Sequence, residues 1–275
     1  GNTILVAGGY MVFDEVNDFG TEFALSEHGD DVVLSSCDIT GALSTYRAFV
    51  SFDANANGVT LGRHTLSTGE VDFVAMQSPT FEGFNSGPLV GSVVIEEIMY
   101  NPDGPGGTEY ILMKNISGTA VDLFDPANPT NTWQISGGVD FVFPEGVTVQ
   151  PGEFVLITSV LPATYLASHT VGASITVLGP FDLGALSNGG DTITVSVPGT
   201  PETGPVFTPY IPIETIKYND SLPWPEAPDG DGPALSKLQG SLDQYGNDPI
   251  NWGASGGPTI TIDSLTTDDQ TPEIT

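Results

Sequence analysis

The feature that most constrains this sequence is the way glycine and proline divide it into short runs of β-branched and aromatic residues. Its 275 residues include 34 glycines and 22 prolines. The clearest run, Val93–Pro102, predicts a strand ending in an Asn-Pro turn, and after a Gly/Pro-rich loop Glu109–Asn115 predicts a second strand. Long amphipathic stretches with a helical period are absent, and the best helical candidate is the short segment Leu161–Ser168. The pattern therefore predicts an all-β fold.

The order of these runs is repeated within the chain. Five stretches near the N-terminus have counterparts in the same order further on. The pairs are Gly9–Phe13 with Gly152–Leu156, Leu25–Asp30 with Leu186–Asp191, Phe49–Asp53 with Thr215–Asn219, Gly58–Arg63 with Gly232–Lys237, and Asp72 with Asp248. We therefore expect two tandem domains, with residues 1–90 as a partial copy of the complete domain at residues 91–258.

The first copy has no counterpart of Val93–Phe143 and so begins in mid-domain. Within it, Thr3–Phe13 predicts strands around a Gly-Gly turn, including Tyr10–Phe13. Half a sandwich leaves core surface and strand edges uncovered. We expect the missing strands to lie upstream in the natural protein. In this sequence the gap would be covered by the second copy, by another chain through strand complementation or dimerisation, or by Thr259–Ile262.

The charge of the chain bears on its partners. Five basic residues stand against 35 acidic ones, for a formal net charge of -30. Such a surface repels phosphate backbones, so nucleic acid and anionic membranes are poor partners and divalent cations are good ones. No apolar run reaches the ~18 residues needed for membrane insertion. The single cysteine, Cys37, excludes an intrachain disulfide. No signal peptide is present, and Gly1 suggests a boundary from which export signals were cut away.

Several motifs of the second copy together resemble bacterial lamin tail domains. They are Val94–Pro102, Glu109–Ile111, Val121–Leu123, Trp133–Ile135, Phe143–Gly146, Leu186–Asp191, Pro223–Pro225, Asp229–Gly232 and Asn251–Ser255. The resemblance covers residues 92–258 completely and 3–88 in part. It implies two tandem immunoglobulin-like β-sandwich domains, the first lacking its N-terminal strands. It also implies accessory modules of large secreted or cell-surface proteins. Residues 259–275 resemble the opening strand of a bacterial surface immunoglobulin-like repeat, and we expect a linker there.

Two acidic loops are candidate calcium sites, because calcium takes six to eight oxygen ligands. Asp53, Asn55 and Asn57 have the D-x-N-x-N-G spacing of a calcium loop, but His64 stands where an EF-hand carries its last glutamate. In the second copy the candidates are Asp220, Asp229 and Asp231. The alternative is that both loops are simply turns, which Asp-Gly and Asn-Gly pairs favour.

Aromatic residues offer a candidate ligand site. Trp224 lies between two prolines, and with Tyr218 it would form a stacking platform for a sugar. The alternative is that Trp224 plugs one end of the sandwich. Trp133 and Trp252 lie within strand patterns and are expected in the core.

Catalytic groups are not recognisable in the sequence. Glu96 and Glu97 are adjacent, but neighbours on a strand point to opposite faces, which favours a structural role. His28, His64 and His169 show no zinc-binding spacing. We expect a non-catalytic structural, adhesion or docking module of a large extracellular bacterial protein, with calcium as its one candidate cofactor. The alternatives are a carbohydrate-binding accessory module attached to a secreted enzyme, with a polysaccharide partner, and an enzyme whose site spans both copies.

Overall fold

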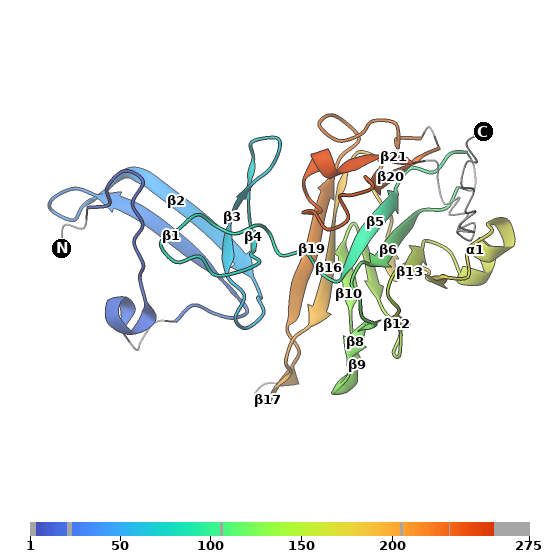
Figure 1. The fold of residues 1–275 in the computed structure, drawn as a ribbon, viewed down its shortest axis with the longest axis horizontal. Helices are drawn as coiled ribbons and strands as arrows, with labels where there is room; N and C mark the ends of the chain where they lie inside the picture. Colours follow the sequence, from blue (N-terminus) through green and yellow to red (C-terminus); the bar gives the residue numbers. More distant parts are fainter. Residues whose placement is uncertain (1–3, 21–23, 105–106, 204–205, 231, 256–275) are drawn as a thin grey trace, which may run out of the picture.

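The computed structural model describes residues 4–20, 24–104, 107–203, 206–230 and 232–255. These residues are almost entirely strands and turns, and their main body, from residue 93 onward, is an immunoglobulin-like β-sandwich (Figure 1). The all-β prediction is confirmed. The predicted linker at residues 259–275, including Thr259–Ile262, lies outside the described residues, as do Thr3 and Asp231.

Two sheets form the sandwich. Their strands, in spatial order, are β15 (Leu183–Gly184), β11 (Val139–Val142), β10 (Gln134–Gly137), β16 (Asp191–Pro198) and β19 (Tyr210–Tyr218) in the five-stranded sheet, and β14 (Ile175–Leu178), β13 (Phe154–Thr158), β6 (Tyr110–Asn115), β5 (Val93–Met99), β20 (Ala234–Lys237) and β21 (Trp252–Ser255) in the six-stranded sheet. All pairings in them are antiparallel except β13 with β14.

Alternation along the strands divides the apolar residues into two clusters. On β6, Ile111 and Met113 pack into the core between the sheets, whereas Tyr110 and Leu112 pack on the outer face beneath the helix α1 (Pro162–Ser168). Strand β13 is buried along its whole length because both of its faces are covered. The sandwich thus has its own complete core, which includes Trp133 and Trp252 as predicted.

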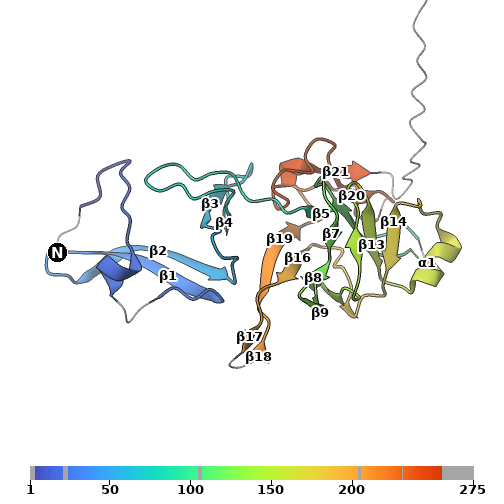
Figure 2. The same ribbon diagram turned by 60° about the horizontal axis from the view of Figure 1, so that its bottom comes forward.

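Several short elements lie outside these two sheets. They are the strand pairs β7 (Val121–Asp122) with β12 (Thr148–Val149), β8 (Phe124–Asp125) with β9 (Asn128–Thr132) and β17 (Glu202–Thr203) with β18 (Val206–Phe207), and a 3₁₀ turn at Pro249–Asn251. The pair β17–β18 lies at the tip of the long β16–β19 hairpin (Figure 2).

The N-terminal region, meaning the described residues before residue 91, contains two separate hairpins (Figure 1). They are β1 (Gly29–Cys37) with β2 (Leu43–Asp53), and β3 (Leu61–Thr65) with β4 (Val71–Ala75). Among the described residues, no strand of the sandwich pairs with any of these four. Many apolar side chains of β1 and β2 are exposed, including Val33, Leu34 and Phe49.

One expected strand is not present. The segment Tyr10–Phe13 forms no strand and leads into a π-helical turn at Glu15–Phe19, so the prediction of strands over Thr3–Phe13 is wrong for its described part. A strand exists only where a neighbour pairs with its backbone hydrogen-bonding groups, and no strand of the described chain pairs with these residues.

The β3–β4 hairpin is joined to the sandwich through the loop after β20. The carboxylate of Asp72 accepts hydrogen bonds from Tyr245 Oη at 2.9 Å and Asn247 Nδ2 at 2.7 Å. Asp248 accepts one from the amide of Ser67 at 2.9 Å. The ring of His64 meets that of Tyr245 edge to face. This contact is polar, so it docks the hairpin without giving the N-terminal region an apolar core.

Candidate functional site

A tight turn at the start of β1 holds two candidate side chains, Glu27 and His28. Ser26 Oγ accepts a hydrogen bond from the amide of His28 at 3.1 Å, and Gly29 N donates to the carbonyl of Ser26 at 3.2 Å. Gly29 has φ 110, and a Cβ there would lie 2.5 Å from the carbonyl oxygen of Phe52. Glycine is therefore required at this point.

The same turn is tied to the loop that follows β2. The amide of Asn55 donates to the carbonyl of Glu27 at 3.2 Å, while Asn55 Nδ2 donates to the carbonyl of Val59 at 2.8 Å. The loop is thus closed on itself and fixed against the turn. Glu27 and His28 consequently project from a supported backbone rather than from a free loop.

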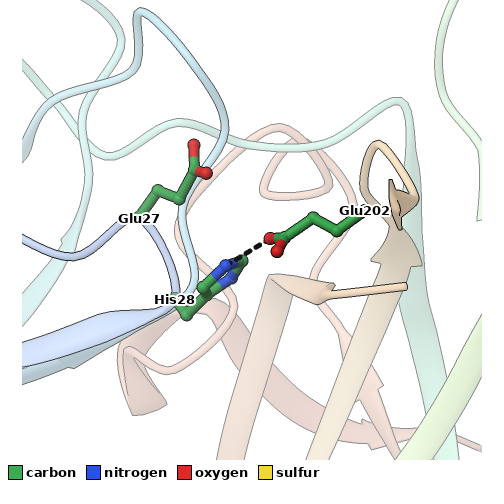
Figure 3. A group of neighbouring side chains, drawn as sticks. All are labelled: Glu27, His28 and Glu202. Atoms are coloured by element: carbon green, nitrogen blue, oxygen red, sulfur yellow. Dashed lines mark ion pairs between the residues drawn. The ribbon is translucent and has the colours of Figure 1, made fainter. Parts of the chain in front are cut away.

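A third side chain comes from the sandwich. Glu202, on β17, forms an ion pair with Nε2 of His28 (Figure 3). Phe207, which pairs with Glu202 across the β17–β18 hairpin, meets the His28 ring edge to face with centroids 5.8 Å apart. The imidazole is therefore oriented by a carboxylate and an aromatic ring of the other region.

Glu27, His28 and Glu202 form a group that we call the junction triad. One ligand atom from each residue lies within 4.8 Å of the other two, and Figure 3 shows Glu27 next to His28 with the His28 ring directed at Glu202. Imidazole nitrogen with carboxylate oxygen is a donor set that binds transition metals in proteins. Chemically, the arrangement is suited to holding a cation.

A cavity of about 670 Å³ adjoins the junction triad. The N-terminal region contributes Glu27, His28 and the loop 54–57, and the sandwich contributes residues around Asp125 and the segments 198–201 and 209–211. The walls thus come from both regions, so a ligand here would contact both.

The first predicted calcium loop lies at this junction. Asp53 is exposed at the end of β2, and Asn55 and Asn57 line the cavity. The side-chain amide of Asn55 is already used in closing its own loop. The structure therefore places two of the three residues beside the junction triad, and calcium binding by this loop stays a prediction.

The second predicted calcium loop lies at the end of the sandwich near Tyr100. Asp229 accepts a hydrogen bond from Asn101 Nδ2 at 2.6 Å. Burial, followed by the charges of Asp229 and Asp220, raises the pKa of Tyr100 to about 12, and its buried hydroxyl has no hydrogen-bond partner among the described residues. Asp231 lies outside the described residues. Calcium binding here also stays a prediction.

The two aromatic candidates lie inside the sandwich. Trp224 is 6% exposed and packs against Trp252, with ring centroids 6.0 Å apart. Tyr218 is 2% exposed, stacks on Tyr100 and donates its hydroxyl to the carbonyl of Ser187 at 2.9 Å. Neither ring offers a face to solvent. The carbohydrate-binding alternative therefore loses the residues on which it depended.

The adjacent glutamates of β5 have structural partners. Glu96 pairs with Lys114 at 3.5 Å, and burial raises the pKa of its carboxyl group. Glu97 accepts hydrogen bonds from Tyr110 Oη at 3.1 Å and Ser255 Oγ at 2.8 Å. The register shifts between Ile95 and Glu97, so Glu96 stands at a β-bulge, and the charge of Glu97 adds to the rise in the pKa of the Glu96 carboxyl group. This agrees with a structural role for both.

Sequence reasoning missed the junction triad because residue 202 is far from residues 27 and 28 along the chain. No zinc-binding spacing relates His28 to the other two histidines, so the sequence pattern alone does not mark it as a ligand. The repeat contained a usable signal: the positions of Glu27 and His28 in the Leu25–Asp30 turn correspond to Asn188 and Gly189 in Leu186–Asp191. Two metal-binding residue types thus stand where the other turn has ordinary turn formers.

Comparisons with known proteins bear on the sandwich. Within the described residues, no helix is long and apolar enough to cross a membrane. Searches of curated proteins and of solved structures found no match. Residues 88–198 match the model of the Lamin Tail Domain family, a non-catalytic immunoglobulin-like family, which fits the expectation of a non-enzyme for this part of the chain. Over these residues, from β5 to the end of β16, the chain is similar to a lamin tail domain.

Proposed function

We propose that the chain is a non-catalytic docking module of a large exported bacterial protein. In it, a lamin-tail-like sandwich follows an incomplete copy of the same fold. The incomplete copy, the N-terminal region, would receive strands equivalent to β5, β6, β10, β11 and β13 from an upstream segment of that protein. The observation that supports the proposal is that the β1–β2 hairpin has the same pairing register as the β16–β19 hairpin of the sandwich.

Five consecutive residue pairs support this equivalence. Asp30 pairs with Phe52 and Leu34 with Ala48 in β1–β2, and at the corresponding positions Asp191 pairs with Tyr218 and Val195 with Glu214 in β16–β19. The three pairs between them also correspond. A slip of one residue would exchange the two faces of a strand, so agreement over five pairs is a strong constraint.

The turns that lead into these hairpins also agree. In both, the glycine amide donates to a serine carbonyl, at 3.2 Å for Gly29 and 3.3 Å for Gly190. The following aspartate accepts from the amide of that serine, at 3.4 Å for Asp30 and 3.3 Å for Asp191. The glycines have φ 110 and 114. The equivalence thus extends from the strands to the turn.

The β3–β4 hairpin corresponds in the same way to β20–β21, but its register changes one of the residue pairs expected from the sequence. Leu61 pairs with Ala75 and Arg63 with Phe73, while Leu235 pairs with Ala254 and Lys237 with Trp252. Continuing the register equates Asp72 with Asn251, not with Asp248 as the sequence alone suggested. Strand β20 also pairs with β5, whereas within the described chain β3 pairs only with β4.

The apolar surface of β1–β2 is what the incoming strands would cover. Val33 and Phe49 pair across the hairpin on one face, and Val32 and Leu34 lie on the other. All four are exposed. Exposed apolar patches of this kind mark interaction sites, and unpaired strand edges recruit further strands. The function we propose is therefore docking through strand addition.

Solution mass tests this proposal. With its strand partners missing, the chain should associate with itself in a concentration-dependent manner through β1–β2, and Phe49→Lys should weaken that association because a charge is costly in an apolar contact. Leu222→Lys is the matched control, because Leu222 is an exposed leucine in the sandwich. Light scattering coupled to size exclusion gives the mass. A strict monomer whose β1–β2 hairpin resists proteolysis would contradict the proposal.

A further inference from the structure

The junction triad sits where two regions distant in sequence meet, and its three side chains are all metal-ligand types. His28 Nε2 already contacts Glu202, and Glu27 completes the group, with the ligand atoms within 4.8 Å of one another. Side-chain exposure of 39% for His28 and 38% for Glu202 leaves both open to an ion from solvent. A histidine among the ligands distinguishes this group from an ordinary acidic patch.

The geometry points to a zinc site formed by Glu27, His28 and Glu202, which would clamp the N-terminal region to the β17–β18 hairpin. This inference is independent of the proposed docking function. Zinc is bound at about 2.0–2.2 Å by histidine nitrogen and carboxylate oxygen, so ligands of a tetrahedral ion lie roughly 3.4 Å apart. Zinc binding would therefore separate the direct contact between His28 and Glu202 and draw Glu27 closer by up to about 1.4 Å, movements within reach of flexible glutamate side chains.

Neighbouring groups hold the backbone of Glu27 and His28 and the ring of His28 in place. The Ser26–Gly29 turn and the Asn55 amide hold the backbone of Glu27 and His28. The ring of Phe207 meets the imidazole edge to face and orients it. Ligands held by surrounding groups lose less freedom on binding than ligands on free loops.

The donor set also selects among cations. Calcium and magnesium prefer six or more oxygen ligands, whereas one imidazole nitrogen with two carboxylates and an open position suits zinc. The net charge of -30 attracts every divalent cation, so general attraction must be separated from site binding. Physiological salt reduces the general component, and an excess of magnesium competes for what remains.

Isothermal titration with zinc, in salt and excess magnesium, tests the site. We expect one zinc per chain. His28→Ala, Glu27→Gln and Glu202→Gln should each reduce the zinc affinity more than about tenfold, because the loss of a residue that only hydrogen-bonds to a metal ligand already reduces metal affinity by about 10–100-fold. His169→Ala and Glu226→Gln are the controls, a histidine and a glutamate outside the junction triad, and should bind as the parent chain does.

Cobalt gives a second readout that does not depend on affinity. Substitution of Co²⁺ for zinc should produce the intense visible absorption of a four-coordinate site, and His28→Ala should abolish it. Circular dichroism of each variant confirms that the fold is retained. Zinc binding that is absent in the parent chain, unchanged in His28→Ala, or matched by calcium would overturn the assignment.

Discussion

The hairpins β1–β2 and β16–β19 share one register and differ in burial. Ile193 and Val195 of β16 are 0% exposed, while at the corresponding positions Val32 and Leu34 of β1 are 39% and 57% exposed. The difference lies in their neighbours, because β10 pairs with β16 and the six-stranded sheet packs against it. Among the described strands, none flanks β1–β2 in this way. Local sequence therefore specifies a hairpin, and other strands must bury it.

The largest contrast is expected at a buried ion pair. Lys237 Nζ lies 2.8 Å from Glu214, with the two side chains 0% and 8% exposed. The corresponding residues are Arg63 and Ala48. Lys237→Ala leaves a buried carboxylate unpaired and should lower the free energy of unfolding by about 3–5 kcal/mol. Arg63→Ala should change it by less than about 0.5 kcal/mol. Urea unfolding followed by circular dichroism measures both, and equal losses would remove the contrast.

A matched pair of valines tests burial alone. Val195→Ala removes methyl groups from a closed core and should cost about 2 kcal/mol. Val32→Ala makes the same chemical change on an exposed face and should cost less than about 0.5 kcal/mol. Urea midpoints give both values. If Val32→Ala proved as costly as Val195→Ala, the β1–β2 hairpin would have a core that the structure does not show.

The smallest contrast converts one hairpin residue into its counterpart. Tyr218 occupies the position of Phe52, and burial raises the pKa of Tyr218 above its ordinary 10.0. The unfolded chain therefore ionises first, so this contribution to stability is complete below pH 10 and is lost as the pH rises above it. Tyr218→Phe should cost about 1 kcal/mol at neutral pH, for the bond to Ser187, and should reduce the alkaline loss. Urea midpoints at neutral and alkaline pH measure this, and an unchanged alkaline slope would contradict the linkage.

Much of the fold followed from local patterns. Runs of β-branched and aromatic residues predicted β5 and β6, and the Leu25–Asp30 and Leu186–Asp191 turns could be predicted because glycine is needed at one position in each. The match between Gly9–Phe13 and Gly152–Leu156 wrongly predicted a strand in the first stretch, because only the second stretch leads into a strand with hydrogen-bonded neighbours. Apolar character alone does not supply a partner.

The candidate site was less accessible to sequence reasoning. The junction triad depends on a contact between residues 28 and 202, and no spacing rule encodes that contact. The calcium loops were found by spacing, which says nothing about which oxygens are already used, as the amide of Asn55 shows. The position of Trp224 between two prolines is compatible with an exposed sugar-stacking ring and with a ring buried at one end of the sandwich. Its packing on Trp252 favours the buried ring.

Amide hydrogen exchange of β1–β2 tests the central claim most directly. One sample is the chain itself, and the other carries an extra copy of residues 91–185 joined ahead of Ile4, which supplies the strands from β5 to β15 a second time. We predict that β1–β2 exchanges much faster than β16–β19 in the first sample and becomes protected in the second. Unchanged exchange of β1–β2 after the addition would contradict the claim that this hairpin belongs to an incomplete second copy of the sandwich fold.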